Sequence, residues 1–157
     1  MKLLIKSRKS LEKMARNTFP DGTAVISITD ANDFQVAFEN EPDYLLRIAF
    51  NDVDNDVFAD ELLDNPTDEE RAEIERKYDM ISQDQADEIA YFYINHKDDI
   101  STLVCQCEHG QSRSAAVAAA ILEYRSGRGI KIFADDRYYP NKVVFRKVYN
   151  ALTKKDK

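Results

Sequence analysis

One short segment of this sequence holds the residue types that could carry out covalent chemistry. Cys107 is followed by Gly110, Arg113 and Ser114 within seven residues. A thiolate is a strong nucleophile, and an arginine guanidinium offers a planar fork of donors that matches two oxygens of a phosphate group. The Ser114 hydroxyl is placed to donate to the sulfur. The segment therefore predicts a site where a cysteine meets a bound anion.

The elements on either side of this segment explain why an anion would bind there. Thr102–Cys105 reads as an apolar strand, and 114–124 is rich in Ala, Val, Ile and Leu, which predicts a buried helix. The N-terminus of a helix presents unpaired N–H groups and the positive end of the dipole, so it attracts anions and favours a thiolate. Arg113 at the helix start opposes the dipole, and a bound anion explains its presence better than solvation does.

The spacing of these residues resembles a known catalytic loop. Cysteine-based protein tyrosine and dual-specificity phosphatases share the pattern Cys-x-x-Gly-x-x-Arg-Ser/Thr, which stands here as Cys107-Glu108-His109-Gly110-Gln111-Ser112-Arg113-Ser114. The resemblance extends to the helix 115–122, to Pro140-Asn141 followed by Phe145, and to the strands 25–30 and 45–52. It covers most of the chain and is closest to the small phosphatases of bacteria and their phages.

The resemblance implies a mechanism and a set of site residues. The Cys107 thiolate would attack phosphorus and form a phosphocysteine, and Ser114 would stabilise the thiolate when it leaves. Arg113 and the backbone N–H groups would hold the phosphate oxygens. The implied chemistry needs neither a metal nor another cofactor. The phosphate-binding residues would be Glu108, His109, Gly110, Gln111, Ser112 and Arg113.

The general acid must come from another part of the chain, because the leaving oxygen needs a proton. The family takes it from an Asp on a mobile loop after the preceding strand, and that position corresponds to Asp52. Asp54 and Asp56 follow in the same loop and remain alternatives. The distance from Asp52 to Cys107 is longer than in compact family members, so we expect an acidic insertion of one or two helices at about 54–80.

Two positions near the nucleophile need separate interpretation. The family usually has His directly before the cysteine, whereas this chain has Gln106, so the degree of thiolate activation is open. His109 occupies a variable position and could shape substrate entry. We interpret Cys105 as a core residue rather than a redox partner. A Cys105–Cys107–His109 metal site is disfavoured, because the chain has no further Cys and only one other His.

The order of the predicted elements indicates the fold class. Strands are expected at 3–5, 23–28, 44–50 and 102–105. Helices are expected after a cap at Ser10, after the Thr67–Glu70 capping box, over 82–96 and 114–124, and after Pro140 in a first turn. Strands that alternate with helices predict a single α/β domain, residues 1–157, with a central mostly parallel sheet flanked by helices, like that of dual-specificity phosphatases. The aromatic residues Tyr138, Tyr139 and Phe145 are expected to pack in the interior.

Composition restricts the partners. The chain has 157 residues and a net charge of −7, but residues 51–100 carry four basic and seventeen acidic side chains, whereas residues 101–157 carry eleven and five. This balance argues against a broad nucleic-acid surface but allows a local anion pocket. Two cysteines, no export signal and no long apolar stretch favour a cytoplasmic protein without a membrane partner.

The expected substrate is a phosphorylated protein, above all at tyrosine, with phosphoserine or phosphothreonine as a further choice, or a small phosphomonoester. The alternatives are a phosphatase of a phosphoinositide or of an RNA 5′ end, and a phosphate-binding module with little turnover. Tyrosine and serine phosphatases differ in pocket depth, which the sequence leaves open.

Overall fold

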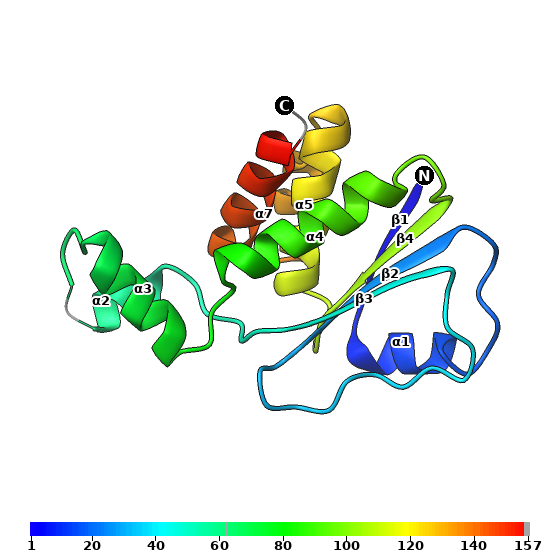
Figure 1. The fold of residues 1–157 in the computed structure, drawn as a ribbon, viewed down its shortest axis with the longest axis horizontal. Helices are drawn as coiled ribbons and strands as arrows, with labels where there is room; N and C mark the ends of the chain where they lie inside the picture. The colour runs from blue at the N-terminus through cyan, green and yellow to red at the C-terminus, as the bar shows by residue number, and fades with distance from the viewer. Residues whose placement is uncertain (62, 156–157) are drawn as a thin grey trace.

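A parallel β-sheet forms the centre of this α/β domain (Figure 1). The computed structural model describes residues 1–61 and 63–155, and in them four strands pair in the order β1-β4-β2-β3, each pair parallel. These strands confirm the predicted ones to within one or two residues. They are β1 (Lys2–Lys6), β2 (Thr23–Thr29), β3 (Tyr44–Ala49) and β4 (Thr102–Gln106).

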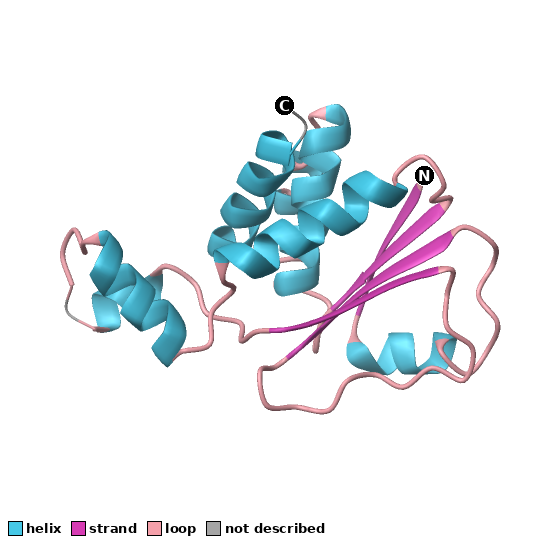
Figure 2. Cartoon of the chain, viewed as in Figure 1, coloured by secondary structure: helices cyan, strands magenta, loops and turns pink. Residues whose placement is uncertain are grey.

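Helices cover both faces of the sheet (Figure 2). One face carries α1, the other carries α4, α5 and α7, and α2 and α3 form a pair that extends from the body of the domain (Figure 1). Parallel strands need a crossover connection; α1 lies in the one from β1 to β2 and α2, α3 and α4 in the one from β3 to β4, whereas residues 30–43 between β2 and β3 contain no helix. The helices of the described residues are α1 (Arg8–Met14), α2 (Asp56–Asp60), α3 (Asp68–Lys77), α4 (Gln83–His96), α5 (Arg113–Ser126), α6 (Ile130–Phe133) and α7 (Lys142–Lys155).

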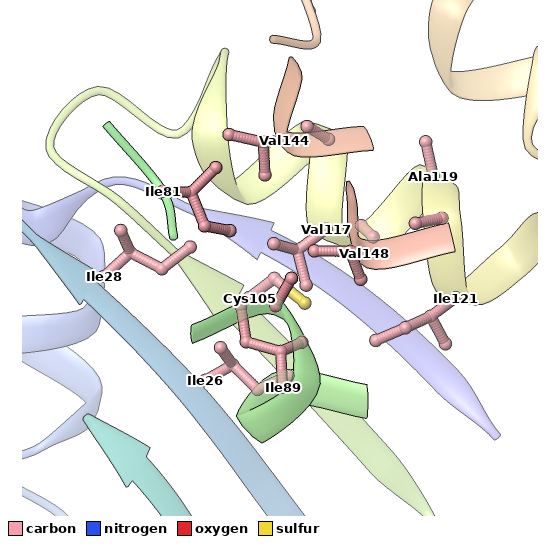
Figure 3. Close-up of a cluster of buried hydrophobic side chains, with 14 of the residues drawn as sticks. Ile26, Ile28, Ile81, Ile89, Cys105, Val117, Ala119, Ile121, Val144 and Val148 are labelled. Atoms are coloured by element: carbon pink, nitrogen blue, oxygen red, sulfur yellow. The ribbon is translucent and has the colours of Figure 1, made fainter. Parts of the chain in front are cut away.

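The larger hydrophobic core lies between the sheet and the three-helix face (Figure 3). Helix α5 is buried along most of its length, and its small alanine side chains let the strands and α7 approach closely. A smaller core lies under α1, where Leu11 packs with Val25 and Val104. Because both faces of the sheet are covered, β2 is buried at every position and lacks the polar alternation of a half-exposed strand.

The acidic stretch at about 54–80, the insertion expected from the sequence, contains α2 and α3; that it is an insertion relative to the phosphatases stays a prediction. The capping box that begins α3 is formed, since Thr67 accepts from the Glu70 N–H and Glu70 accepts from the Thr67 N–H. The insertion is joined to the domain by Lys147, whose ammonium lies 2.7 Å from the Glu75 carboxylate. It is also joined by Asn51, whose N–H donates to the Asp79 carbonyl at 2.7 Å. The end of the insertion, at Asp79, is therefore hydrogen-bonded to the loop after β3, where the insertion begins.

Two predicted helix starts were wrong. Helix α1 is capped by Ser7, whose hydroxyl accepts from the Ser10 N–H, so Ser10 lies within the helix. Pro140 precedes α7 rather than occupying its first turn, and Asn141 provides the cap by accepting from the Val144 N–H at 3.0 Å. In both cases a polar side chain nearer the true start satisfies the free N–H groups of the first turn.

The topology brings three separate segments to one edge of the sheet. All strands are parallel, so β2, β3 and β4 end at the same edge, and there they deliver Asp30, the segment 50–52 and Cys107. Clefts outside the carboxyl ends of parallel strands are where ligands bind in open α/β sheets. Across the described residues, none of the helices is long and apolar enough to span a membrane.

Candidate active site

Gly110 lets the loop between β4 and α5 pack closely against the backbone at the end of β1. Gly110 has a φ of +68°, and a Cβ at this position would lie 2.6 Å from the Ser7 backbone nitrogen and 2.7 Å from the Lys6 carbonyl carbon. The loop therefore rests directly on the junction of β1 and α1. Two hydrogen bonds secure it there, from the Arg8 N–H to the Glu108 carbonyl and from the Cys107 N–H to the Lys6 carbonyl.

Cys107 lines a cavity at the N-terminus of α5. The cavity has a volume of about 250 Å³ and is lined by Asp52, Cys107, His109, Gln111, Ser112, Arg113 and Tyr139. The Cys107 Sγ lies 3.1 Å from the Ser114 Oγ, and only 2% of Cys107 is exposed. A sulfur in this position faces the positive end of the helix dipole and has a hydroxyl within hydrogen-bonding distance.

The N-terminus of α5 is available to an anion. Ser112 is at the cap position, but its hydroxyl donates to the Asp52 carboxylate at 2.8 Å and makes no capping bond. The N–H groups of the first turn of a helix lack partners within the helix. A phosphate group bound in the cavity could accept hydrogen bonds from them.

Arg113 is the buried cation of the site, with 4% of its surface exposed. Its Nη1 donates to the Phe50 carbonyl at 2.7 Å and lies 2.7 Å from the Asp30 carboxylate. Its Nε is buried and has no hydrogen-bond partner among the described residues. A buried unpaired donor costs about 1–3 kcal/mol, and a bound oxyanion would remove that cost.

Asp52 lines the same cavity as Cys107, and two donors hold its carboxylate. Its Oδ1 accepts from Ser112 Oγ at 2.8 Å and from Asn141 Nδ2 at 2.9 Å. The two alternatives lie elsewhere: Asp54 accepts from the Lys142 N–H at 2.9 Å, and Asp56 is in the first turn of α2. Of the three candidates for the acid, Asp52 is the one among the residues that line the cavity with Cys107.

Gln106 is buried at the end of β4, and its side chain is hydrogen-bonded to β2 and to the backbone of Cys107. Its Oε1 accepts from the Ser27 hydroxyl, and its Nε2 donates to the Cys107 carbonyl at 3.0 Å and to the Ile28 carbonyl at 3.4 Å. A neutral amide at this position holds the backbone at Cys107 without bringing a charge.

Cys105 is completely buried in the larger core, as predicted. Burial, with a smaller contribution from the nearby Cys107, raises the pKa of the Cys105 thiol far above its ordinary value, so it stays protonated and inert at neutral pH. Within residues 1–61 and 63–155, no group of three or more His, Cys, Asp or Glu side chains is placed to hold a metal ion.

The sequence did not predict that Asp30, Asn51 and Tyr139 lie near the site. Asp30 pairs with Arg113, and Asn51 accepts from the Ala31 N–H at 3.0 Å, which ties the Asp30 segment to the Asp52 loop. The position of Asp30 directly after β2 was the available signal, since parallel strands end together. Tyr139 was expected to pack inside, but 72% of it is exposed and it lines the cavity. The packing prediction is confirmed for its neighbours Tyr138 and Phe145.

The sequence matches no protein-family model and no curated protein.

Proposed function

We propose that this chain is a cysteine-dependent phosphatase that hydrolyses phosphomonoesters through a phosphocysteine intermediate, on a fold like that of the dual-specificity phosphatases. One observation carries the proposal: Cys107, buried Arg113 and Asp52 line one cavity at the N-terminus of α5, and the Arg113 Nε has no hydrogen-bond partner among the described residues. A thiol, an oxyanion-binding cation and a carboxyl group are the three components that this reaction requires.

The first half of the reaction transfers the phosphoryl group to sulfur. The Cys107 thiolate attacks phosphorus, the S–P bond forms and the bond from phosphorus to the ester oxygen breaks. Protonated Asp52 gives its proton to the leaving oxygen, which departs as an alcohol. Arg113 and the loop N–H groups stabilise the negative charge that is spread over the three equatorial oxygens.

The second half regenerates the enzyme. Water attacks phosphorus, Asp52 accepts its proton, the S–P bond breaks and inorganic phosphate forms. Cys107 leaves as a thiolate, and the Ser114 hydroxyl at 3.1 Å donates to it. The bonds that Asp52 accepts from Ser112 and Asn141 keep its carboxyl group over the cavity during both steps.

The proposal extends to substrate and compartment. A phosphorylated protein is the substrate we propose, and two free, buried cysteines fit a reducing compartment such as the cytoplasm.

Hydrolysis of p-nitrophenyl phosphate tests the proposal. We expect wild-type protein to release nitrophenol, Cys107→Ser to abolish turnover, and Asp52→Asn to lower kcat by about 10²–10⁴. Asp54→Asn is the matched control, because Asp54 lies in the same loop but its carboxylate binds the N-terminus of α7. Quenching the Asp52→Asn reaction with acid should reveal, by mass spectrometry, a phosphate group on Cys107.

Three results would contradict the proposal or its parts. Substantial turnover by Cys107→Ser would contradict the phosphocysteine mechanism. A larger loss in Asp54→Asn than in Asp52→Asn would contradict the assignment of the acid. If wild-type protein binds phosphotyrosine but turns over no phosphate ester, the chain is a phosphate-binding module.

A further inference from the structure

We propose that Asn51 is a positioning residue for the acid step: its hydrogen bonds hold the loop of Asp52 against the end of α3 and so keep Asp52 at the cavity. This role rests on the phosphatase activity and the acid proposed above, and it gives the insertion that contains α3 a part in catalysis. Asn51 does not line the cavity, so it acts through its neighbour.

The end of α3 presents backbone carbonyl groups that the helix itself cannot pair. The Met80 N–H donates to the Glu75 carbonyl at 2.9 Å. The Asp79 N–H donates to the Arg76 carbonyl at 3.3 Å, and Asp79 has a φ of +51°. These bonds and the left-handed residue form the Schellman ending of a helix. The carbonyl groups of Tyr78 and Asp79 are left without partners within the helix.

Asn51 donates to both of these carbonyl groups. Its backbone N–H lies 2.7 Å from the Asp79 oxygen, and its Nδ2 lies 3.1 Å from the Tyr78 oxygen. Its Oδ1 accepts from the Ala31 N–H at 3.0 Å. The contact lies where the pair α2 and α3 joins the body of the domain (Figure 1). One residue therefore links the loops after β2 and β3 to the end of α3.

Other residues hold the Asp52 loop from its opposite side. The Asp52 carboxylate accepts from Ser112 and Asn141, and the Val53 carbonyl accepts from Asn141 Nδ2 at 3.0 Å. These donors lie in the loop before α5 and in the segment before α7. Without the amide of Asn51, the backbone before Asp52 is no longer held by a side chain. Proton transfer requires hydrogen-bonding distance, so a displacement of about 1 Å costs about 10²-fold in rate.

The identity of the leaving group makes the test specific for the acid. Phenol is a much weaker acid than 2,4-dinitrophenol, so phenyl phosphate needs a proton on its leaving oxygen far more than 2,4-dinitrophenyl phosphate does. The parameter kcat/KM reports the steps up to formation of the phosphocysteine. In Asn51→Ala we expect kcat/KM to fall about 10²-fold for phenyl phosphate and less than about threefold for 2,4-dinitrophenyl phosphate.

Two single variants provide the reference values. Asp52→Asn should show the same dependence on the leaving group, because it removes the acid itself. Asn55→Ala is the matched control, since Asn55 follows in the same loop and its side chain makes no capping bond to α2. Its kcat/KM should equal that of wild type for both esters.

A double variant separates positioning of the acid from damage to the fold. Because Asn51 acts through Asp52, adding Asn51→Ala to Asp52→Asn should change kcat/KM for phenyl phosphate by less than about twofold. Losses that multiply in the double variant would overturn the inference. An equal loss on both esters with weaker inhibition by inorganic phosphate would overturn it as well, since the whole cavity would then have changed.

Asn51→Asp tests the bond to α3 by itself, and it replaces Asn51→Ala where circular dichroism shows that the alanine variant does not fold. A carboxylate can accept from the Ala31 N–H as the amide oxygen does, but it cannot donate to the Tyr78 carbonyl. We expect a loss of about tenfold on phenyl phosphate and little change on the dinitrophenyl ester. Unchanged activity on both esters would overturn the inference.

The same measurements distinguish this inference from the proposed function. A wild-type protein that hydrolyses neither ester contradicts the phosphatase activity, and the role of Asn51 falls with it. An equal loss on both esters in Asp52→Asn contradicts Asp52 as the acid. A loss that depends on the leaving group in Asp52→Asn but not in Asn51→Ala contradicts the role of Asn51 and leaves the phosphatase activity standing.

Discussion

The substitution Gly110→Ala tests whether the phosphate loop depends on its close contact with the β1–α1 junction. The new methyl group would lie 2.6 Å from the Ser7 nitrogen and 2.7 Å from the Lys6 carbonyl carbon. Both atoms belong to the backbone, so neither can rotate away as the end of a side chain could. The loop or the start of α1 must therefore move, and either movement displaces the N–H groups that surround the Cys107 cavity.

Two contributions set the expected loss of unfolding free energy in Gly110→Ala. A left-handed backbone conformation costs a non-glycine residue about 1–2 kcal/mol. Forcing a methyl group into a filled space costs about 1–3 kcal/mol more. We expect the free energy of unfolding of Gly110→Ala to fall by about 2–5 kcal/mol, where both costs are summed.

Gly127 supplies the matched control for this experiment. Its φ is +67°, nearly the same as that of Gly110, but a Cβ there would meet no heavy atom of the structure within 4 Å. Gly127→Ala should therefore pay the conformational cost alone, about 1–2 kcal/mol. The difference between the two variants isolates the contact with the β1–α1 junction.

Urea unfolding followed by circular dichroism measures both stabilities, and hydrolysis of p-nitrophenyl phosphate measures the site. For the folded fraction of Gly110→Ala we expect kcat/KM to drop by about 10² or more, the usual effect of losing one oxyanion donor. Gly127→Ala should keep wild-type activity. Equal destabilisation of the two variants, or full activity in Gly110→Ala, would refute the reasoning.

Three further predictions concern the thiols, the brace on the acid and the surface charge. Native protein treated with iodoacetamide at neutral pH should gain one label, on Cys107, as measured by intact mass, because burial raises the pKa of the Cys105 thiol. Urea should expose Cys105 and allow a second label. Two labels without urea would contradict the burial of Cys105. Asn141→Asp should keep the cap of α7 and a near-normal urea midpoint, but it should lower kcat because a carboxylate cannot donate to Asp52. Asn141→Ala should lose activity and also about 1 kcal/mol of stability. Full activity in Asn141→Asp would contradict the role of the Asn141–Asp52 hydrogen bond. Because residues 51–100 carry a net charge of −13, raising ionic strength should increase kcat/KM for a phosphopeptide with acidic flanks more than for a neutral one, and a flat salt profile for both would argue against a charged rim.

Local patterns accounted for much of the fold. The four strands are predicted because each is a short apolar run, the capping box at Thr67 places the start of α3, and the helical spacing over 82–96 predicts α4. The misplaced starts of α1 and α7 have a common cause. Several polar residues near each start could act as the cap, and the choice between Ser7 and Ser10 depends on where β1 ends and the chain turns.

The loop from Cys107 to Ser114 is the feature that the sequence determined by itself. The distance from the end of a strand to the first turn of a helix is short, so the residues that meet there are specified by their spacing alone. The partners of that loop were decided by tertiary structure. Asp30 and Asp52 reach it because the order β1-β4-β2-β3 places the end of β2 beside β4 and the end of β3 beside β2 on the same edge, at separations along the chain that no local pattern encodes. Tertiary structure also decided which of Asp52 and Asp54 lines the cavity and whether Tyr139 is exposed. Both depend on how the segment before α7 packs against the loops that follow β3 and β4.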